Sequence, residues 1–297
     1  MQEKTLIVIA GPTGVGKTAA AIKIAQALGT EIISADSRQI FREIPIGTAA
    51  PTADEQAKAK HHFVGFKSIT DYYSAAEFEA DVLALLPSLF AKSDYAVMCG
   101  GSMLYVDAVC KGIDQMPTIS NEVREKVLRQ YHECGIECII AQLELLDPDY
   151  LKIVDIKNEK RLLHALEICL QAGVPYSTLR TGQVKPRPFK MMKIGLDMPR
   201  QELFDRINRR VDAMIDAGLV EEARSVYPQR HLNSLNTVGF KEMFEWMNGE
   251  MDFITARERI KKNTRVYAKR QLTWYRKDAA MKWLHPCEVE NILSELI

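Results

Sequence analysis

The chain has 297 residues, which is enough to bury a large hydrophobic core in one large domain or two smaller ones. Apolar residues make up 47% and charged residues 26%, as in ordinary globular proteins, and the formal net charge is zero. No apolar stretch approaches the roughly 18 residues that a transmembrane helix needs, and no signal peptide precedes the first predicted strand. These features predict a cytoplasmic protein without a membrane partner, in which any nucleic-acid contact comes from a local basic patch.

The first hundred residues alternate between strand and helix patterns. The apolar run 5–10 precedes a glycine-rich turn and a helix, and further apolar runs lie at 31–36 and 95–101. A helix is predicted to begin after Ser74, an N-cap that has Glu77 three residues later. This alternation predicts an α/β fold with a doubly wound parallel sheet and ligands at the carboxyl ends of its strands.

From about Asn121 the pattern becomes helical, with Gly135 and Gly173 as predicted helix C-caps. No strand pattern interrupts this region, so we predict an all-helical insertion domain over 119–188. The core then comprises 1–118 and 189–297. Within its second part we expect a strand over 191–198, followed only by helices up to a long, final basic helix.

The stretch GPTGVGKT, residues 11–18, fits the P-loop pattern G-x-x-x-x-G-K-[ST] between a strand and a helix. Its glycines let several N–H groups point at one anion, and the helix N-terminus adds positive potential. Lys17 is expected on the outer phosphate oxygens, and the Thr18 hydroxyl is the expected Mg²⁺ ligand. The alternative is a plain strand–turn–helix with a surface lysine. We therefore predict a diphosphate or triphosphate site formed by Gly11, Pro12, Thr13, Gly14, Val15, Gly16, Lys17 and Thr18.

Two polar residues follow neighbouring predicted strands. Asp36 should lie near the phosphate, because the carboxyl ends of parallel strands share one edge of the sheet. Its carboxylate can ligate Mg²⁺ or accept a proton from a nucleophile; the alternative is an aspartate that only caps a turn or helix. Ser102 offers a hydroxyl at the same edge, or it caps a helix. The predicted catalytic residues are Asp36, Lys17, Thr18 and Ser102.

The third predicted strand ends in Cys99, two glycines and a serine, without an acidic residue. ATPases normally place an aspartate there to hold Mg²⁺, so its absence argues against ordinary ATP hydrolysis. The six cysteines contain no C-x-x-C pair and are expected to be free thiols. His61 and His62 are adjacent and lack metal-ligand spacing, so we assign them to packing or loop hydrogen bonds.

Residues 261–277 contain seven Lys or Arg and no acid, interleaved with aromatic side chains. Helical spacing places Lys262, Arg265, Lys269 and Arg276 on one broad face, which favours a polyanionic partner over a merely solvated face. Arg206 and Arg210 lie one helical turn apart, a spacing suited to holding phosphate oxygens. They are therefore added to the predicted diphosphate-binding residues.

Taken together, the motifs resemble those of the bacterial tRNA dimethylallyltransferase (tRNA isopentenyltransferase) family. The resemblance covers nearly the whole chain and rests on GPTGVGKT, IISADSRQIFREIPIGTA, YSAAEFEADV, GGSMLY, EKRLLHALEI, RINRRVDAMIDAGLVEE, TVGFKEM and AKRQLTWYR. Members of this family transfer a dimethylallyl group from its diphosphate to the exocyclic amine of the adenosine that is 3′-adjacent to the anticodon. The resemblance implies that the P-loop holds the diphosphate leaving group and that Asp36 serves as the general base.

The resemblance also implies which residues contact the anticodon stem-loop. Near the P-loop these are Asp36, Ser37, Arg38, Gln39 and Ser102, and in the insertion they are Arg124, Lys160, Arg161, Leu162, Leu163 and His164. In the second part of the core they are Asn236, Thr237, Val238, Gly239, Phe240 and Lys241, to which the basic face adds Lys262, Arg265 and Lys269.

Several positions depart from the family pattern. Phe41 stands where tyrosine is common, Ala50 where lysine is usual, and Asn236 where relatives can have arginine. These changes put individual tRNA contacts in doubt rather than the reaction. The expected partners are the tRNA anticodon stem-loop, dimethylallyl diphosphate and Mg²⁺, and the expected state is a monomer. The alternative functions are a P-loop kinase and, less favoured, a binding module without catalysis.

Overall fold

The computed structural model describes residues 3–296, in two compact units. The larger unit comprises Met1–Cys110 and Pro186–Ile297, and the smaller comprises Lys111–Lys185. Both bounds of the predicted insertion, 119–188, therefore lie closer to the C-terminus than the bounds of the smaller unit. The segments that enter and leave the smaller unit bind each other, since the Lys185 N–H donates to the Lys111 carbonyl at 2.7 Å. Arg187, by contrast, is bound to the larger unit through Glu79 at 2.6 Å.

The larger unit is built on a six-stranded parallel sheet, with strand order β3-β2-β4-β1-β5-β6. Every pair of neighbouring strands is parallel, as predicted for a doubly wound fold. The central strands are almost completely buried, because helices cover both faces of the sheet. The strands are β1 (Thr5–Ala10), β2 (Ile32–Ser34), β3 (His61–His62), β4 (Tyr95–Gly100), β5 (Lys190–Leu196) and β6 (Met281–Leu284).

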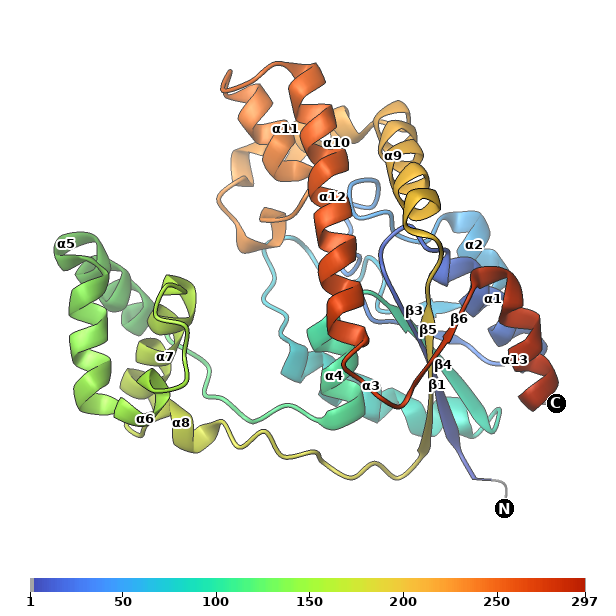
Figure 1. Cartoon of the computed structure of the whole chain (residues 1–297), viewed down its shortest axis with the longest axis horizontal. Coiled ribbons are helices and arrows are strands. Elements are labelled where there is room, and N and C mark those ends of the chain that lie inside the picture. The colour runs from blue at the N-terminus through green and yellow to red at the C-terminus, as the bar shows by residue number, and fades with distance from the viewer. Residues whose placement is uncertain (1–2, 297) are drawn as a thin grey trace. The chain divides into compact units, whose positions relative to one another are not determined.

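Helices pack on both faces of the sheet, which Figure 1 shows nearly edge-on. On one face lie α1 (Lys17–Ala27) and α13 (Val289–Leu296), and on the other lie α3 (Ala75–Phe90) and α4 (Met103–Lys111). Helix α3 begins with a capping box in which Ser74 and Glu77 satisfy each other's backbone N–H groups, as predicted.

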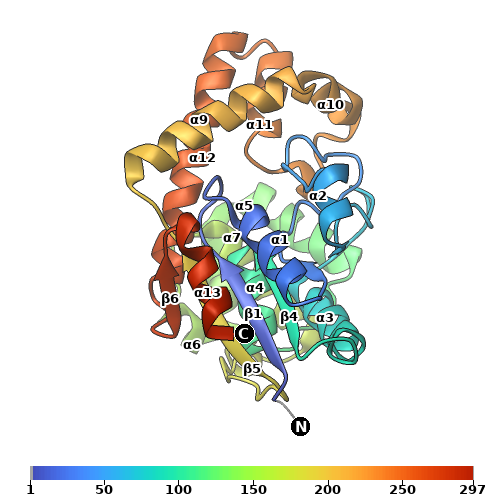
Figure 2. The same cartoon turned by 90° about the vertical axis from the view of Figure 1, so that its right-hand side faces the viewer.

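A second helical layer lies beyond the carboxyl ends of the strands, where Figure 2 shows α9 and α12. Its helices share a core with the loop that follows β2, and Phe240 and Ile44 in that core are completely buried. These helices cover the carboxyl ends of the strands, the edge of the sheet at which doubly wound folds bind ligands. The layer consists of α9 (Arg200–Asp216), α10 (Leu219–Val226), α11 (Phe240–Met247) and α12 (Phe253–Tyr275), and α2 (Ala53–Lys58) lies in the loop between β2 and β3.

Helices are the only regular secondary structure among the described residues of the smaller unit between its connecting segments, which confirms the predicted all-helical insertion. Gly135 interrupts α5 with a non-helical conformation, and Gly173 ends α7 in the left-handed conformation that favours glycine. Leu162, Leu143 and Ile139 form its own buried core. Its helices are α5 (Asn121–Leu146), α6 (Pro148–Leu151), α7 (Glu159–Ala172) and α8 (Tyr176–Leu179).

Two edge strands contradict the predicted element order. The region after β5 is not only helical, because β6 pairs with β5 and is followed by α13. β3 consists only of His61 and His62, which pair with β2. Both strands are short, since β3 is two histidines and β6 is four residues interrupted by Lys282, so neither shows the long apolar run that marked the central strands.

Candidate active site

The register of the sheet brings three predicted site segments to one edge. Ala10 at the end of β1 lies opposite Gly100 at the end of β4, and Ser34 at the end of β2 lies opposite Cys99. The P-loop, the turn after β2 and the loop before α4 follow these three strands. All three line one cavity of about 1650 Å³, together with residues of α2, α9 and α12. The prediction that they share one edge is confirmed.

The P-loop is held tightly against the end of β5. Gly11 has φ 146°, and a Cβ atom there would lie 2.6 Å from the Leu196 carbonyl oxygen, so a larger residue would not fit. Lys17 begins α1, and its Nζ donates to the carbonyl oxygens of Gly11 at 3.0 Å and of Pro12 at 2.8 Å. The loop therefore folds around the lysine, as a phosphate-binding loop requires.

Positive charge is concentrated beside this loop. Burial lowers the pKa of Lys17 to about 8, an effect that Arg210 reinforces and Asp36 opposes. Arg206 and Arg210 line the same cavity from α9, and a Cβ at Gly16 would lie 3.3 Å from the Arg206 guanidinium. Neither arginine forms an ion pair within the described chain. Such unpaired cations on a cavity wall create a potential that attracts an anion.

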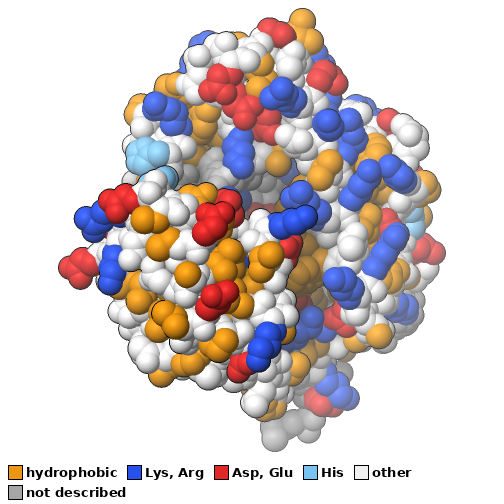
Figure 3. Space-filling view, turned by 60° about the vertical axis from the view of Figure 1, so that its left-hand side comes forward, with side chains coloured by type: hydrophobic (Ala, Val, Ile, Leu, Met, Phe, Trp, Pro, Cys, Tyr) orange, Lys and Arg blue, Asp and Glu red, His pale blue; other side chains and the backbone are white. Residues whose placement is uncertain are grey.

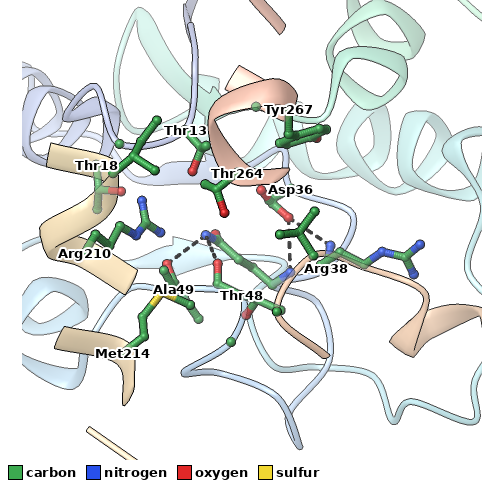
Figure 4. Close-up of a pocket in the computed structure, with 18 of the residues that line it drawn as sticks. Thr13, Thr18, Asp36, Arg38, Thr48, Ala49, Arg210, Met214, Thr264 and Tyr267 are labelled. Atoms are coloured by element: carbon green, nitrogen blue, oxygen red, sulfur yellow. Dashed lines mark hydrogen bonds between the residues drawn. The ribbon is translucent and has the colours of Figure 1, made fainter. Parts of the chain in front are cut away.

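Asp36 lies in the turn after β2, and Figure 4 shows it beside Tyr267 of α12. Its Oδ1 accepts hydrogen bonds from the backbone N–H groups of Arg38 at 2.9 Å and Gln39 at 3.3 Å. Among the described residues none donates to Oδ2. One carboxylate oxygen therefore fixes the turn, as the structural alternative required, and the other stays available to a ligand in the cavity.

The hydroxyl of Ser102 binds the neighbouring turn rather than capping α4. Its Oγ accepts from the Ser37 N–H at 2.8 Å and lies 3.2 Å from the Ser37 Oγ. Tyr267 of α12 lines the same cavity. Burial, reinforced by Asp36, raises the pKa of Tyr267 to about 12, so its hydroxyl keeps its proton at neutral pH. The Ser37 and Ser102 hydroxyl groups thus form a hydrogen-bonded pair at the edge that also carries Asp36.

The loop that follows the Asp36 turn forms another cavity wall, and two side chains fix it. Gln39 Nε2 donates to the carbonyl oxygens of Thr48 at 3.3 Å and Ala49 at 2.9 Å, as Figure 4 shows. Glu222 of α10 accepts two backbone N–H groups of this loop, one from Ile46 at 2.8 Å. The side chain of Gln39, a predicted tRNA contact, is thus engaged within the protein.

The predicted tRNA-contacting stretch before α11 is divided by burial. Asn236 and Lys241 are exposed and line the cavity, together with Thr237, Val238 and Gly239. Phe240 is completely buried, and a Cβ at Gly47 would lie 2.4 Å from its ring. The prediction is therefore wrong for the Phe240 side chain, which belongs to the hydrophobic core.

In the smaller unit, the predicted contacts at the start of α7 are divided in the same way. Lys160, Arg161 and His164 are exposed, whereas Leu162 is completely buried and cannot present its side chain to a ligand. Leu163 is half-buried against the same core. Arg124 is exposed and lies 3.8 Å from Glu167, which also lies 3.6 Å from His164. The α7 stretch thus offers cationic side chains at its surface, except at the leucines.

The predicted basic face of α12 is narrower than expected. Lys262 and Lys269 are exposed, but Arg265 donates to Asn208 of α9 at 2.6 Å. Arg276 follows the end of the helix and pairs with Asp197 at 2.7 Å, so it is not part of the predicted face. On the face in Figure 3, Lys and Arg side chains are interspersed with Asp and Glu, in keeping with zero net charge.

Four residues near the cavity were missed by sequence reasoning: Glu222, Tyr267, Arg270 and Gln271. Arg270 lines the cavity from α12, and Gln271 is 1% exposed beside the P-loop. Three of them lie in the AKRQLTWYR motif or just before it, and Glu222 ends the GLVEE motif. A motif marks such a stretch as a whole, but only the packing reveals which of its residues face the site.

The described residues hold neither a metal-ligand cluster nor a membrane-spanning helix. No cluster of three or more His, Cys, Asp or Glu side chains suited to a metal ion occurs among them. None of the helices in that part of the chain has the length and apolarity of a membrane span. The six cysteines are free thiols, as predicted. His61 Nδ1 lies 2.8 Å from the Ala59 carbonyl and His62 Nε2 lies 2.6 Å from Glu31, which confirms hydrogen bonds for this pair, although the two residues form β3 rather than a loop.

Comparison with known proteins identifies the relatives of this site and fold. The model of the IPP transferase family matches residues 39–278. The tRNA dimethylallyltransferase 1 of Phocaeicola vulgatus is 54% identical over 98% of this chain and 97% of its own length. The tRNA dimethylallyltransferase 1 of Bacteroides fragilis is 53% identical over 100% of this chain and 98% of its own length.

Solved structures of transferases with the same kind of name also superpose on this chain. The full-length tRNA isopentenylpyrophosphate transferase of Bacillus halodurans superposes with a TM-score of 0.72 at 32% identity, covering 99% of this chain and 96% of that one. A eukaryotic dimethylallyltransferase acting on tRNA gives a TM-score of 0.77 at 26% identity, covering 91% of this chain and 69% of that one. By its sequence and its fold, this chain belongs to the IPP transferase family, the tRNA dimethylallyltransferases.

Proposed function

We propose that this protein transfers a dimethylallyl group from dimethylallyl diphosphate to the exocyclic amine of the adenosine 3′-adjacent to the anticodon of certain tRNAs. The observation that carries the proposal is the single cavity in which a P-loop, unpaired cations and the Asp36 carboxylate meet. A reaction in which diphosphate is the leaving group needs the P-loop and the cations, and a weak nitrogen nucleophile needs the carboxylate as a base. We expect the protein to act on tRNA in the cytoplasm.

The diphosphate would bind to the P-loop amides, with Lys17, Arg206 and Arg210 around it. The Lys17 Nζ donates to two P-loop carbonyls, which places the ammonium group beside the loop amides. When the C–O bond of the donor breaks, negative charge develops on diphosphate oxygens that these donors already surround. Donors positioned for developing charge typically contribute roughly 2.7–4 kcal/mol each to the lowering of the barrier.

The acceptor nitrogen would approach the donor carbon from the side of Asp36. The lone pair of an exocyclic adenine amine is delocalised into the ring, so the C–N bond forms readily only if a proton leaves the nitrogen. Oδ2 of Asp36 would accept that proton, since Oδ1 is occupied by the turn. The base must also leave its stack to enter the cavity, as chemistry on a nucleobase generally requires.

Mg²⁺ is the proposed cofactor. Thr18 lines the cavity and supplies one hydroxyl, which fits an ion that typically takes one or two protein ligands and completes its shell with phosphate oxygens and water. When bound, the ion would offset negative charge on the diphosphate. The donor would thus be held by Thr18 through the ion and by Lys17 directly.

We expect the exposed lysines of α12 to contact tRNA phosphates. A Lys262→Gln/Lys269→Gln double variant should bind all anticodon stem-loops more weakly, and each lost phosphate contact should flatten the salt dependence by roughly 0.7–0.9 log unit per log unit of salt. The measurement is a titration of stem-loops at several salt concentrations. Lys92→Gln/Lys190→Gln removes the same charge near the amino ends of β4 and β5 and should leave the slope unchanged. An unchanged slope of the salt dependence in the α12 variant would show that Lys262 and Lys269 face solvent and do not contact tRNA phosphates.

The proposed function is tested most simply in cells. The tRNA of a strain that lacks the gene should contain no dimethylallyl-adenosine, and mass spectrometry of tRNA nucleosides measures this directly. Restoring the gene should restore the modified nucleoside. If the nucleoside persists without the gene, or if the purified protein hydrolyses ATP briskly and transfers no prenyl group, the proposal is wrong and the kinase alternative gains support.

A further inference from the structure

One buried amide, that of Gln271, joins the P-loop to the end of β4. Gln271 lies on α12, is 1% exposed, and approaches both segments from the far end of the chain. Its Oε1 accepts a hydrogen bond from the Thr13 N–H at 2.8 Å, and its Nε2 donates to the Gly101 carbonyl at 2.8 Å. Both functional groups of the side chain are therefore used, each by a different segment of the cavity wall.

The glycine at 101 makes room for this contact. A Cβ atom there would lie 2.4 Å from the Gln271 Nε2, which is closer than a side chain could approach, and 3.5 Å from the Lys17 Nζ. The Gln271 amide and the Lys17 ammonium group thus lie close to the same point beside β4. The second glycine of the GGS motif is therefore explained by the amide that packs against it.

Gln271 also acts on Lys17 through one peptide group. The carbonyl of Pro12 and the N–H of Thr13 belong to the same rigid, planar peptide unit. Lys17 binds the carbonyl end at 2.8 Å, and Gln271 binds the N–H end at 2.8 Å. If the N–H end were released, this peptide could rotate, and the carbonyl that orients Lys17 would rotate with it.

We propose that Gln271 is a positioning residue. It fixes the P-loop, which would bind the diphosphate, relative to the edge of the cavity that carries Asp36. It fixes the peptide that orients Lys17, and it fixes the segment that leads into Ser102. One turn earlier on the same helix, Tyr267 lines the cavity beside Asp36, so α12 faces both the P-loop and the Asp36 edge. This inference rests on the proposed function, in which Lys17 holds the diphosphate of the donor.

The first test is Gln271→Met, which keeps the length of the side chain and removes both hydrogen bonds. A buried N–H and a buried carbonyl would lose their partners, so we expect the affinity for inorganic diphosphate to fall about 10-fold. Because small displacements of reacting groups are costly, we expect kcat to fall about 10- to 100-fold as well. Calorimetric titration with inorganic diphosphate and steady-state kinetics measure the two effects, well below the melting temperature of the variant.

Two further variants separate positioning from stability. Gln271→Glu keeps the acceptor for Thr13 but places a negative charge near Lys17, so it should bind inorganic diphosphate more weakly than Gln271→Met, and added salt should reduce the difference. Thr273→Val changes an exposed residue two positions along the same helix, whose hydroxyl donates only to Lys269 within α12. It should retain wild-type affinity and turnover.

The outcomes distinguish this inference from the proposed function. If the parent protein fails to bind inorganic diphosphate or to transfer the prenyl group, the proposed function fails. If the parent does both, but folded Gln271→Met keeps diphosphate affinity and kcat within twofold of the parent, Gln271 has only a structural role. Equal diphosphate affinity in Gln271→Glu and the parent would also overturn the inference.

Discussion

Replacing Asp36 with asparagine should leave donor binding nearly intact and slow the chemical step by at least about 100-fold, as the loss of a general base does. Asparagine is the sharper substitution because its Oδ1 can still accept from the Arg38 and Gln39 N–H groups that fix the turn. Only the proton-accepting ability of the second oxygen is lost. Single-turnover kinetics with saturating donor and tRNA measure the step directly.

Asp36→Ala serves as the comparison, since it removes the turn bonds as well as the base. If the hydrogen bonds of the turn hold the site in shape, the alanine variant should react more slowly than the asparagine variant and should bind the stem-loop more weakly. A fall of less than tenfold in the asparagine variant would show that Asp36 is not the base. The roles would then have to be reassigned among the hydroxyl groups at this edge.

Replacing Lys17 with methionine should weaken the binding of inorganic diphosphate and slow transfer by about 100-fold or more, because the charge acts in both the ground state and the transition state. The pH dependence adds a second test. Burial lowers the pKa of Lys17 to about 8 in the free protein, so the ammonium form is lost as the pH rises through 8. Diphosphate affinity should therefore fall above pH 8, tending towards about tenfold per pH unit.

The methionine variant supplies the control for that pH profile. It retains the ionisation of the ligand and the Arg206 and Arg210 side chains but lacks the titrating lysine. The difference between the two profiles therefore isolates Lys17. Equal diphosphate affinity in the variant and the parent, or identical pH profiles, would remove Lys17 from the phosphate site.

The sequence was most informative where the signal is local. The P-loop carries its own strand, turn and helix context, and the parallel-sheet rule was enough to bring Asp36 and Ser102 to the same edge. The helical insertion was also predictable, because its periodicity and its glycine C-caps lie within each helix. These features need no knowledge of distant contacts.

What could not be predicted depends on contacts between distant segments. Gln271 binds Thr13 across 258 positions of the chain, and Glu222 binds Ile46 across 176. Neither residue lies in a local sequence pattern that identifies its partner. Likewise, a motif cannot tell which of its residues face inward, which is why Leu162 and Phe240 were assigned to tRNA although they belong to buried cores.

The central claim, prenyl transfer to an adenosine amine, is tested most directly with purified protein, isotope-labelled dimethylallyl diphosphate, Mg²⁺ and an unmodified anticodon stem-loop. We expect the label to appear on the adenosine 3′-adjacent to the anticodon and inorganic diphosphate to be released in equal amount. A stem-loop with guanosine at that position should stay unlabelled. Release of diphosphate without labelled RNA, or labelling that does not depend on that adenosine, would contradict the claim.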